Sequence, residues 1–150
     1  MKAVIQRVTK ASVTVDGKII SSIKNGLLIL LGITNEDNNI DIEWLSKKIV
    51  NLRIFNDKDA IMNKSVMDIE GNIIVVSQFT LLASTKKGNR PSYLKSAKPD
   101  VAIPLYEQFI SQLEKEVGRK VGAGVFGADM KIKLLNDGPV TIIIDSLKRE

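Results

Sequence analysis

The chain has 150 residues, a length that suits a single domain with its own hydrophobic core. It contains neither cysteine nor histidine, which excludes disulfides, Cys/His zinc sites, thiol nucleophiles and Ser-His couples. A net charge of +5 suits a polyanionic partner, and it equally suits a surface whose charges only keep the protein in solution.

Neither a membrane span nor a signal peptide is predicted. The apolar stretch at residues 26–33 has the length of a buried strand rather than of a membrane helix. The opening residues, MKAVIQRV, lack the apolar segment and the cleavage site of a secretory signal. We therefore expect a cytoplasmic protein.

The first part of the chain carries strand patterns followed by one helix pattern. Residues 2–15 alternate between apolar and polar types, which predicts a long strand, and the turn at 16–18 leads to a second strand at 19–23. A third strand is predicted at 27–34. Within residues 35–55, apolar side chains recur at helical spacing behind an acid-rich first turn, which predicts a helix.

The second part of the chain continues with strands around one more helix. Residues 72–79 are almost wholly apolar, which predicts a strand covered on both faces, and 83–100 form a long basic loop. An amphipathic helix is predicted at 101–117. Two further strands, 131–135 and 140–147, are predicted to be joined by a turn.

These elements predict one α+β domain over residues 1–150. Its strands are expected to form a curved, largely antiparallel β-sheet or barrel, packed with two main helices. No repeat, linker or low-complexity segment divides the chain.

The segment SQFTL ends the predicted apolar strand and opens into the basic loop. Ser77, Gln78 and Thr80 therefore emerge together at a strand end, where functional sites are often built. The alternative is a strand end that hydrogen-bonds its own turn.

The basic loop has the composition of a nucleic-acid contact. Lysine and arginine can neutralise phosphates there while Tyr93 stacks on a base, and the cationic residues are Lys86, Lys87, Arg90, Lys95 and Lys98. We predict nucleic-acid contacts by Lys86, Lys87 and Arg90. A solvated loop without a ligand is the alternative.

Two glycine-containing segments need separate interpretations. GAGVFG, residues 122–127, matches G-x-G-x-x-G, but a helix precedes it and a strand follows it, so a glycine-rich bend is predicted instead of a dinucleotide site. NDGPVT, residues 136–141, has turn composition, yet Pro139 removes a ladder donor at the mouth of a strand. Gly138–Pro139 is thus either a plain turn or a cis peptide that presents backbone oxygens to a ligand.

Taken together, several blocks resemble the D-aminoacyl-tRNA deacylase family in order and spacing. They are MKAVIQRVTKASVTVDG, RIFND with MNKSV, VVSQFTL, KKGNRPSY and FGADMKIKLLNDGPVT, and the resemblance covers essentially the whole chain. One departure lies in DKDAIMNKS, where the family more often has a glycine and a basic residue before the methionine.

The resemblance implies a homodimer that hydrolyses the ester between a D-amino acid and the 3′ end of tRNA, with no metal or other cofactor. It implies that Gly138 and Pro139 form a Gly-cis-Pro element that enters the partner subunit's pocket, where it rejects L-aminoacyl groups and tolerates a glycyl group. Arg7 would steady this turn and Met130 would lie in the pocket. The other wall would be formed by Ser77, Gln78, Phe79 and Thr80.

Two mechanisms and two further functions stay open at this point. The 2′-hydroxyl of the terminal adenosine could orient the attacking water, or Thr80 could be a covalent nucleophile, although no residue that would activate it is evident. A non-catalytic RNA-binding module that uses the basic loop 86–98 is the rival function. A structural dimer in which the Gly-Pro turn only mediates association is the third.

Overall fold

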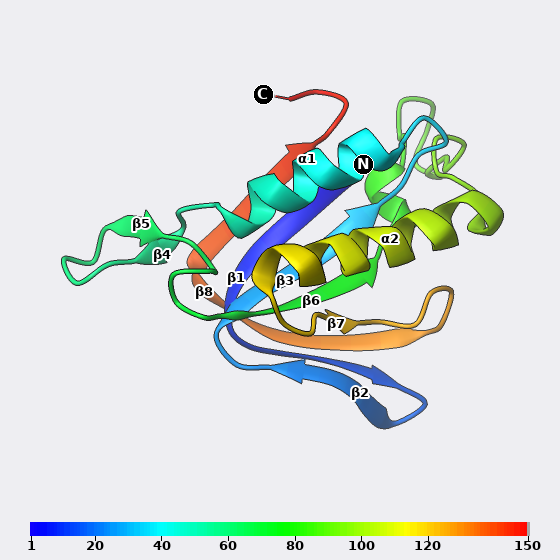
Figure 1. The fold of residues 1–150 in the computed structure, drawn as a ribbon. Coiled ribbons are helices and arrows are strands. Elements are labelled where there is room, and N and C mark those ends of the chain that lie inside the picture. Colours follow the sequence, from blue (N-terminus) through cyan, green and yellow to red (C-terminus); the bar gives the residue numbers. More distant parts are fainter. Residues whose placement is uncertain (150) are drawn as a thin grey trace.

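The computed structural model describes residues 1–149, which form a curved sheet with two long helices on one face and a small hairpin to the side (Figure 1). The strands of the main sheet are, in spatial order, β2 (Lys18–Ile23), β1 (Lys2–Val15), β3 (Gly26–Gly32), β6 (Asn72–Ser77) and β7 (Gly122–Ala123), with β8 (Met130–Asp145) also paired to β1. The remaining elements are α1 (Asn39–Val50), α2 (Pro99–Val117), η1 (Phe79–Leu82), β4 (Phe55–Asn56) and β5 (Met62–Lys64).

The predicted α+β class is confirmed, and the sheet is largely antiparallel as expected. The exceptions are β3 with β6 and β6 with β7, which run parallel. The β3–β6 pair is parallel because α1 and the β4–β5 hairpin provide the long crossover that such a pair requires.

Strand β1 bends the sheet because its two halves pair with different partners. Its first residues, up to Val8, pair with β3, whereas Ala11 to Val15 pair with β2. Strand β8 follows both halves on the other edge. The result is a nearly closed, barrel-like sheet that has a core on each face of its central strands.

The two cores explain the unbroken apolar pattern of β3 and β6. Side chains such as Leu27 and Val75 point into a core shared with α1 and α2. Their neighbours Leu28 and Ile74 point into a second core formed with the curled part of β1 and β8. A strand buried on both faces has no polar alternation, as the sequence predicted.

Helix α1 begins at a capping box formed by Asn38 and Asp41. The Asn38 side chain accepts from the N–H of Ile40 at 2.9 Å, and the Asp41 carboxylate accepts from the N–H of Asn38 at 3.1 Å. Helix α2 begins two residues earlier than predicted, because Pro99 is itself suited to the first turn.

The prediction of a turn at residues 136–141 is wrong. The chain keeps its direction there, and β8 is a single strand whose pairing with β1 resumes on both sides: Asn136 lies opposite Val8 and Thr141 opposite Gln6. Residues 137–140 between them leave the pairing and form an excursion opposite Arg7. The turn-like composition serves this excursion and not a chain reversal.

Two smaller boundaries also differ from the predictions. Strand β6 ends at Ser77, so that Phe79 belongs to η1 and not to the strand. In the glycine-rich segment, Gly122 and Ala123 form β7 beside β6, directly after α2. A strand-glycine-helix context for a dinucleotide is therefore absent from residues 122–127.

Tyr106 joins helix α2 to the strand that leads into the site. Its hydroxyl donates to the carbonyl oxygen of Val75 at 2.8 Å, and the N–H of Gly124 donates to the same oxygen at 3.1 Å. Burial raises the pKa of Tyr106 to about 12. The hydroxyl therefore stays protonated, and continues to donate, well above its ordinary titration range.

We expect Tyr106→Phe to alter the pH dependence of stability. Below pH 10 the variant should be about 1 kcal/mol less stable, a modest loss because Val75 keeps its bond from Gly124. From pH 10 to 12 the unfolded wild type loses the proton first, so the wild type should lose roughly 2–3 kcal/mol that the variant retains. Urea unfolding from pH 8 to 11.5 measures this; two parallel curves would contradict it.

Candidate active site

The candidate site begins where β6 leaves the sheet. The N–H of Gln78 donates to the carbonyl oxygen of Leu31 at 2.8 Å, which extends the β3–β6 pairing by one residue. The chain then turns into η1, and the carbonyl of Phe79 accepts from the Ser96 hydroxyl at 3.0 Å. The segment Ser77–Thr80 is thus held from both sides, which gives it a fixed backbone.

The backbone of η1 offers hydrogen-bond donors. The N–H groups of Leu81 and Ala83 donate to the carbonyls of Gln78 and Thr80. The N–H groups of Phe79 and Thr80 come first in the turn and have no acceptor among residues 1–149. Two adjacent donors therefore remain for a ligand.

The Thr80 hydroxyl has an amide as its neighbour. Gln78 Nε2 donates to Thr80 Oγ1 at 2.5 Å, and this is the side-chain partner that the described residues provide for the hydroxyl. An amide does not take up a proton at neutral pH. The contact fixes the orientation of Thr80 without activating it as a nucleophile.

An aromatic pair stands beside this segment. The ring of Phe79 is 55% exposed and meets the ring of Tyr93 edge to face, with 5.0 Å between their centroids. Tyr93 is itself exposed, in the basic loop. Exposed aromatic faces next to backbone donors suit a planar ligand such as a base.

Met130, the first residue of β8, lies next to strand β6, which leads into Ser77. Met130 packs against the core cluster that contains Val76, the residue before Ser77. Gly124 makes room for it, because a Cβ on Gly124 would lie 2.5 Å from the Met130 sulfur. The grouping of Met130 with Ser77–Thr80 is therefore compatible with a shared pocket.

The predicted nucleic-acid contacts lie at the tip of a closed loop. Ser84 and Ser92 exchange two backbone hydrogen bonds of 2.9 Å, which close residues 85–91 into a loop. Lys86, Lys87 and Arg90 are exposed on this tip. The loop follows η1 directly, so its charges lie close to the candidate site along the chain.

Arg7 fixes the position of the excursion in β8 through hydrogen bonds. This buried side chain donates through Nε to the Asp137 carbonyl at 3.0 Å and through Nη1 to the Ile54 carbonyl at 2.6 Å. Its Nε also lies 3.2 Å from the Asp137 carboxylate. The Gly138–Pro139 peptide that follows is cis, and both residues are exposed.

The excursion and the candidate site lie at different ends of the sheet. Arg7 pairs with Leu27, whereas Ser77 pairs with Leu31, four residues further along β3. At ~3.3 Å per residue and ~4.8 Å per strand, the two features are offset by about 13 Å along and 14 Å across the sheet. In Figure 1 the middle of β8 lies on the opposite side from the turn that follows the β6 arrowhead.

Sequence reasoning missed two positioning residues. Ser96 lies 17 positions from Phe79, whose carbonyl it supports, and no local pattern connects them. Gly124 belongs to the segment interpreted as a bend, and its role became visible only through the Met130 sulfur. Within the described residues no group of three or more acidic side chains could hold a metal ion, and no helix has the length and apolarity of a membrane span.

The family model described as D-Tyr-tRNA(Tyr) deacylase matches residues 4–145, and the chain belongs to this family. Two proteins named D-aminoacyl-tRNA deacylase are similar over the full length. The one from Flavobacterium psychrophilum is 67% identical, covering 100% of both chains. The one from Christiangramia forsetii is 64% identical, covering 99% of both chains.

Solved structures share the fold. One named "c-Myc DNA Unwinding Element Binding Protein" has a TM-score of 0.90 at 44% identity, covering 97% of this chain and 98% of that one. Another, described as a probable eukaryotic D-amino acid tRNA deacylase, has a TM-score of 0.81, covering 95% and 97%. At 16% identity the second likeness concerns the fold alone.

We expect Arg7→Lys to destabilise the protein. A lysine ammonium cannot bond the Asp137 and Ile54 carbonyls with the geometry of a guanidinium, so the free energy of unfolding should fall by about 2–4 kcal/mol. Arg53→Lys is a matched control, because Arg53 makes two similar bonds to Asn63 but is exposed. That control should lose less than ~1 kcal/mol. Equal losses in urea unfolding would mean that Arg7 has no special structural role.

Proposed function

We propose that the protein hydrolyses the ester bond of D-aminoacyl-tRNA and rejects L-aminoacyl-tRNA. The observation that carries this proposal is the full-length match to relatives named D-aminoacyl-tRNA deacylase. The geometry of Ser77–Thr80 supports it, because that segment supplies the donors that ester hydrolysis needs. A tRNA substrate also favours action in the cytoplasm.

The chemistry of the substrate suits a site without histidine. An aminoacyl ester is activated, so a strong general base is unnecessary. The N–H groups of Phe79 and Thr80 would bind the carbonyl oxygen and stabilise the oxyanion that forms when water attacks. The alkoxide of the terminal ribose then leaves, and a proton from the attacking water neutralises it.

The attacking water would be oriented by the 2′-hydroxyl of the terminal adenosine. The rival role, in which Thr80 forms an acyl-enzyme, requires a group that removes the Thr80 proton. Its hydrogen-bond partner is the Gln78 amide, which cannot do so. The contact therefore favours Thr80 as a pocket wall and supports the route assisted by the substrate.

Chiral selection would require a second copy of the chain. Because Gly138 and Pro139 lie far from Ser77–Thr80 in one chain, they would reach a site of this kind only in a homodimer, by entering the partner's pocket. Their carbonyls would then bind the α-amino group and crowd one side of Cα. An L side chain would collide there, a D side chain would point outward, and glycine would be partly accepted.

The rest of the predicted site takes supporting roles in this proposal. Arg7 would set the position of the Gly138–Pro139 turn through Asp137, and Met130 would line the pocket that receives it. Lys86, Lys87 and Arg90 would contact tRNA phosphates from the exposed loop. No metal or other cofactor takes part in the proposed mechanism.

A non-catalytic nucleic-acid-binding module is the second candidate function. The 44% identical structure named as a DNA unwinding element binding protein favours it, together with the basic loop. Release of free D-tyrosine from D-tyrosyl-tRNA by the purified protein distinguishes the two. Binding of tRNA without turnover would support the module and reject the esterase.

We expect the 2′-hydroxyl of the substrate to matter more than the hydroxyl of Thr80. A D-tyrosyl-tRNA that ends in 2′-deoxyadenosine should be cleaved at least about 100-fold more slowly, the size of a typical general acid–base contribution. Thr80→Val should lower kcat by less than about 10-fold, because a wall of the same shape remains. Single-turnover deacylation measures both. Loss of turnover in Thr80→Val with the deoxy substrate still cleaved would reverse the assignment.

We expect Gly138→Ala to reduce the preference for D over L substrates. A Cβ at Gly138 would lie 2.8 Å from Val140 Cγ2 and 3.0 Å from Arg7 Nη2, so the turn would have to shift. The ratio of kcat/KM for D- and L-tyrosyl-tRNA should fall at least about 10-fold. Gly17→Ala is the control, since Gly17 also has a positive φ but open space around it. A folded Gly138→Ala protein with an unchanged ratio would remove the turn from chiral selection.

A further inference from the structure

A cavity of about 530 Å³ lies beside the candidate site, at the same edge of the sheet. Its wall includes Leu82, Ala83 and Ser84, which follow Thr80 directly at the end of η1. Thr80 and Leu82 are two residues apart in a turn that rises ~2.0 Å per residue, so the cavity starts within roughly 4 Å of the site along the helix axis. A ligand chain that leaves the site on this side would enter the cavity.

The wall opposite η1 is held rigidly by the start and the end of the described chain. Asp37 is buried and accepts from both the Met1 ammonium and the N–H of Thr34. The Met1 ammonium also donates to the Ser146 hydroxyl at 2.7 Å. These buried contacts connect β1, the loop after β3 and the end of β8 into one fixed wall.

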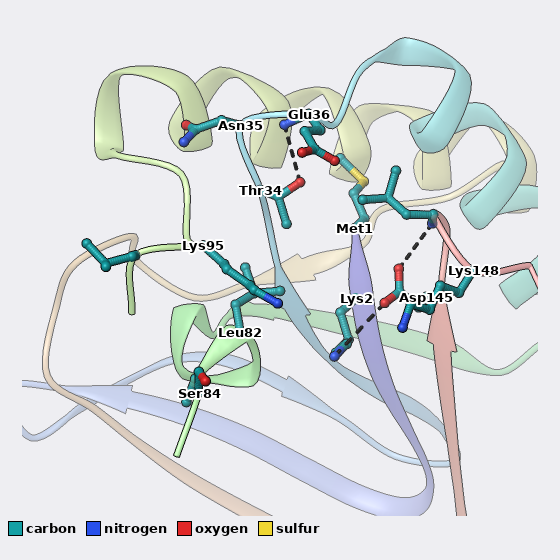
Figure 2. Close-up of a pocket in the computed structure, with 13 residues that line it drawn as sticks. Met1, Lys2, Thr34, Asn35, Glu36, Leu82, Ser84, Lys95, Asp145 and Lys148 are labelled. Carbon is teal, nitrogen blue, oxygen red and sulfur yellow. Dashed lines mark hydrogen bonds and ion pairs between the residues drawn. The ribbon is translucent and has the colours of Figure 1, made fainter. Parts of the chain in front are cut away.

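The cavity carries three lysines against two carboxylates. Figure 2 shows Leu82 and Lys95 on one side and Lys2 and Lys148 on the other, with the amino ends of Lys95 and Lys2 directed into the space between them. Lys2 lies 4.0 Å from the Asp145 carboxylate. Among residues 1–149, no carboxylate lies within 4.0 Å of the ammonium of Lys95 or of Lys148.

The other lining groups suit a nucleotide better than a small anion. Thr34, Asn35 and Ser84 offer hydroxyl and amide groups for a ribose or a base edge, and Leu94, which is 91% exposed, offers an apolar surface at the mouth. The Glu36 carboxylate would repel a free phosphate, but it can accept from the amino group of a base such as cytosine. The volume also lies in the range of ordinary ligand pockets.

We propose that this cavity binds the nucleotide that precedes the terminal adenosine of the substrate RNA, with Lys95 and Lys148 at its phosphate. The inference rests on the proposed function, which puts the ester at the 3′ end of the terminal adenosine against the N–H groups of Phe79 and Thr80. The single-stranded end of the substrate would then run over η1 and be held on both sides of it. The cavity would be a substrate subsite apart from the pocket that selects the D-amino acid.

The test compares two model esters, D-tyrosyl-adenosine and the D-tyrosyl ester of the trinucleotide CCA. In the wild type, kcat/KM should be at least about 10-fold higher for the trinucleotide, since it adds ionic contacts to phosphate. The double variant Lys95→Glu/Lys148→Glu should lose most of that gain, so its kcat/KM falls at least about 10-fold more on the trinucleotide than on the adenosine ester. A thermal melt checks that the variant is folded.

Lys58→Glu is the control, because Lys58 is an exposed lysine between β4 and β5 that does not line the cavity. It should leave the gain from the trinucleotide intact. Equal effects of the double variant on both esters, or a wild type without any gain from the trinucleotide, would overturn the subsite. Failure of the wild type to cleave either ester would instead overturn the proposed function.

Discussion

The register of one long strand sets where every part of the candidate site lies. Strand β1 is fourteen residues long and pairs with β2, β3 and β8; its offset to β3 is constant, whereas its pairings with β2 and β8 contain local register shifts. A shift of one residue would exchange the buried and exposed faces of β1, so the two cores hold this register firmly. Arg7 is thereby fixed opposite the β8 excursion. The end of β6 is fixed as well, at a position four residues further along β3 than the residue that pairs with Arg7.

This arrangement puts ester hydrolysis and the selection of the D-amino acid in two different parts of the chain. In the proposed account, the end of β6 supplies backbone donors and one wall of the pocket, whereas the excursion in β8 supplies the turn at Gly138 and Pro139 that selects the D-amino acid. Selection by backbone atoms has a physical advantage, because carbonyl groups contact what all D-amino acids share and not their side chains. Such a site can accept many D-amino acids while it excludes their mirror images.

The absence of histidine fits the same account. A site that works through fixed N–H groups gains its rate from electrostatic preorganisation, which does not require a titrating side chain. The contacts of the Gln78 and Ser96 side chains serve this end, since they hold η1 in place. Titration of an active-site side chain is then no source of pH dependence in the neutral range.

The sequence predicted those elements whose pattern is local. The apolar runs of β3 and β6 and the helical spacing in α1 and α2 were sufficient for the fold class and for placing Ser77 near a strand end, although the predicted strand ran two residues too far. The path of residues 136–141 was not predictable, because Asn-Asp-Gly-Pro has turn composition and only the pairing with Gln6 and Val8 keeps the chain straight. The cavity beside η1 was also hidden, since Lys2 and Lys148 meet only through the β1–β8 register.

The central claim is that each site combines Ser77–Thr80 of one chain with Gly138–Pro139 of a second. Mixing two variants tests it most directly: Thr80→Trp, which fills the pocket, and Gly138→Trp, which blocks the turn, each inactive alone. After co-refolding, half of the dimers should be mixed, and each mixed dimer should hold one intact site. Activity of about a quarter of the wild type is the predicted result for a symmetric dimer. No recovery in a sample shown to contain mixed dimers would contradict the account, because each chain would then use its own turn.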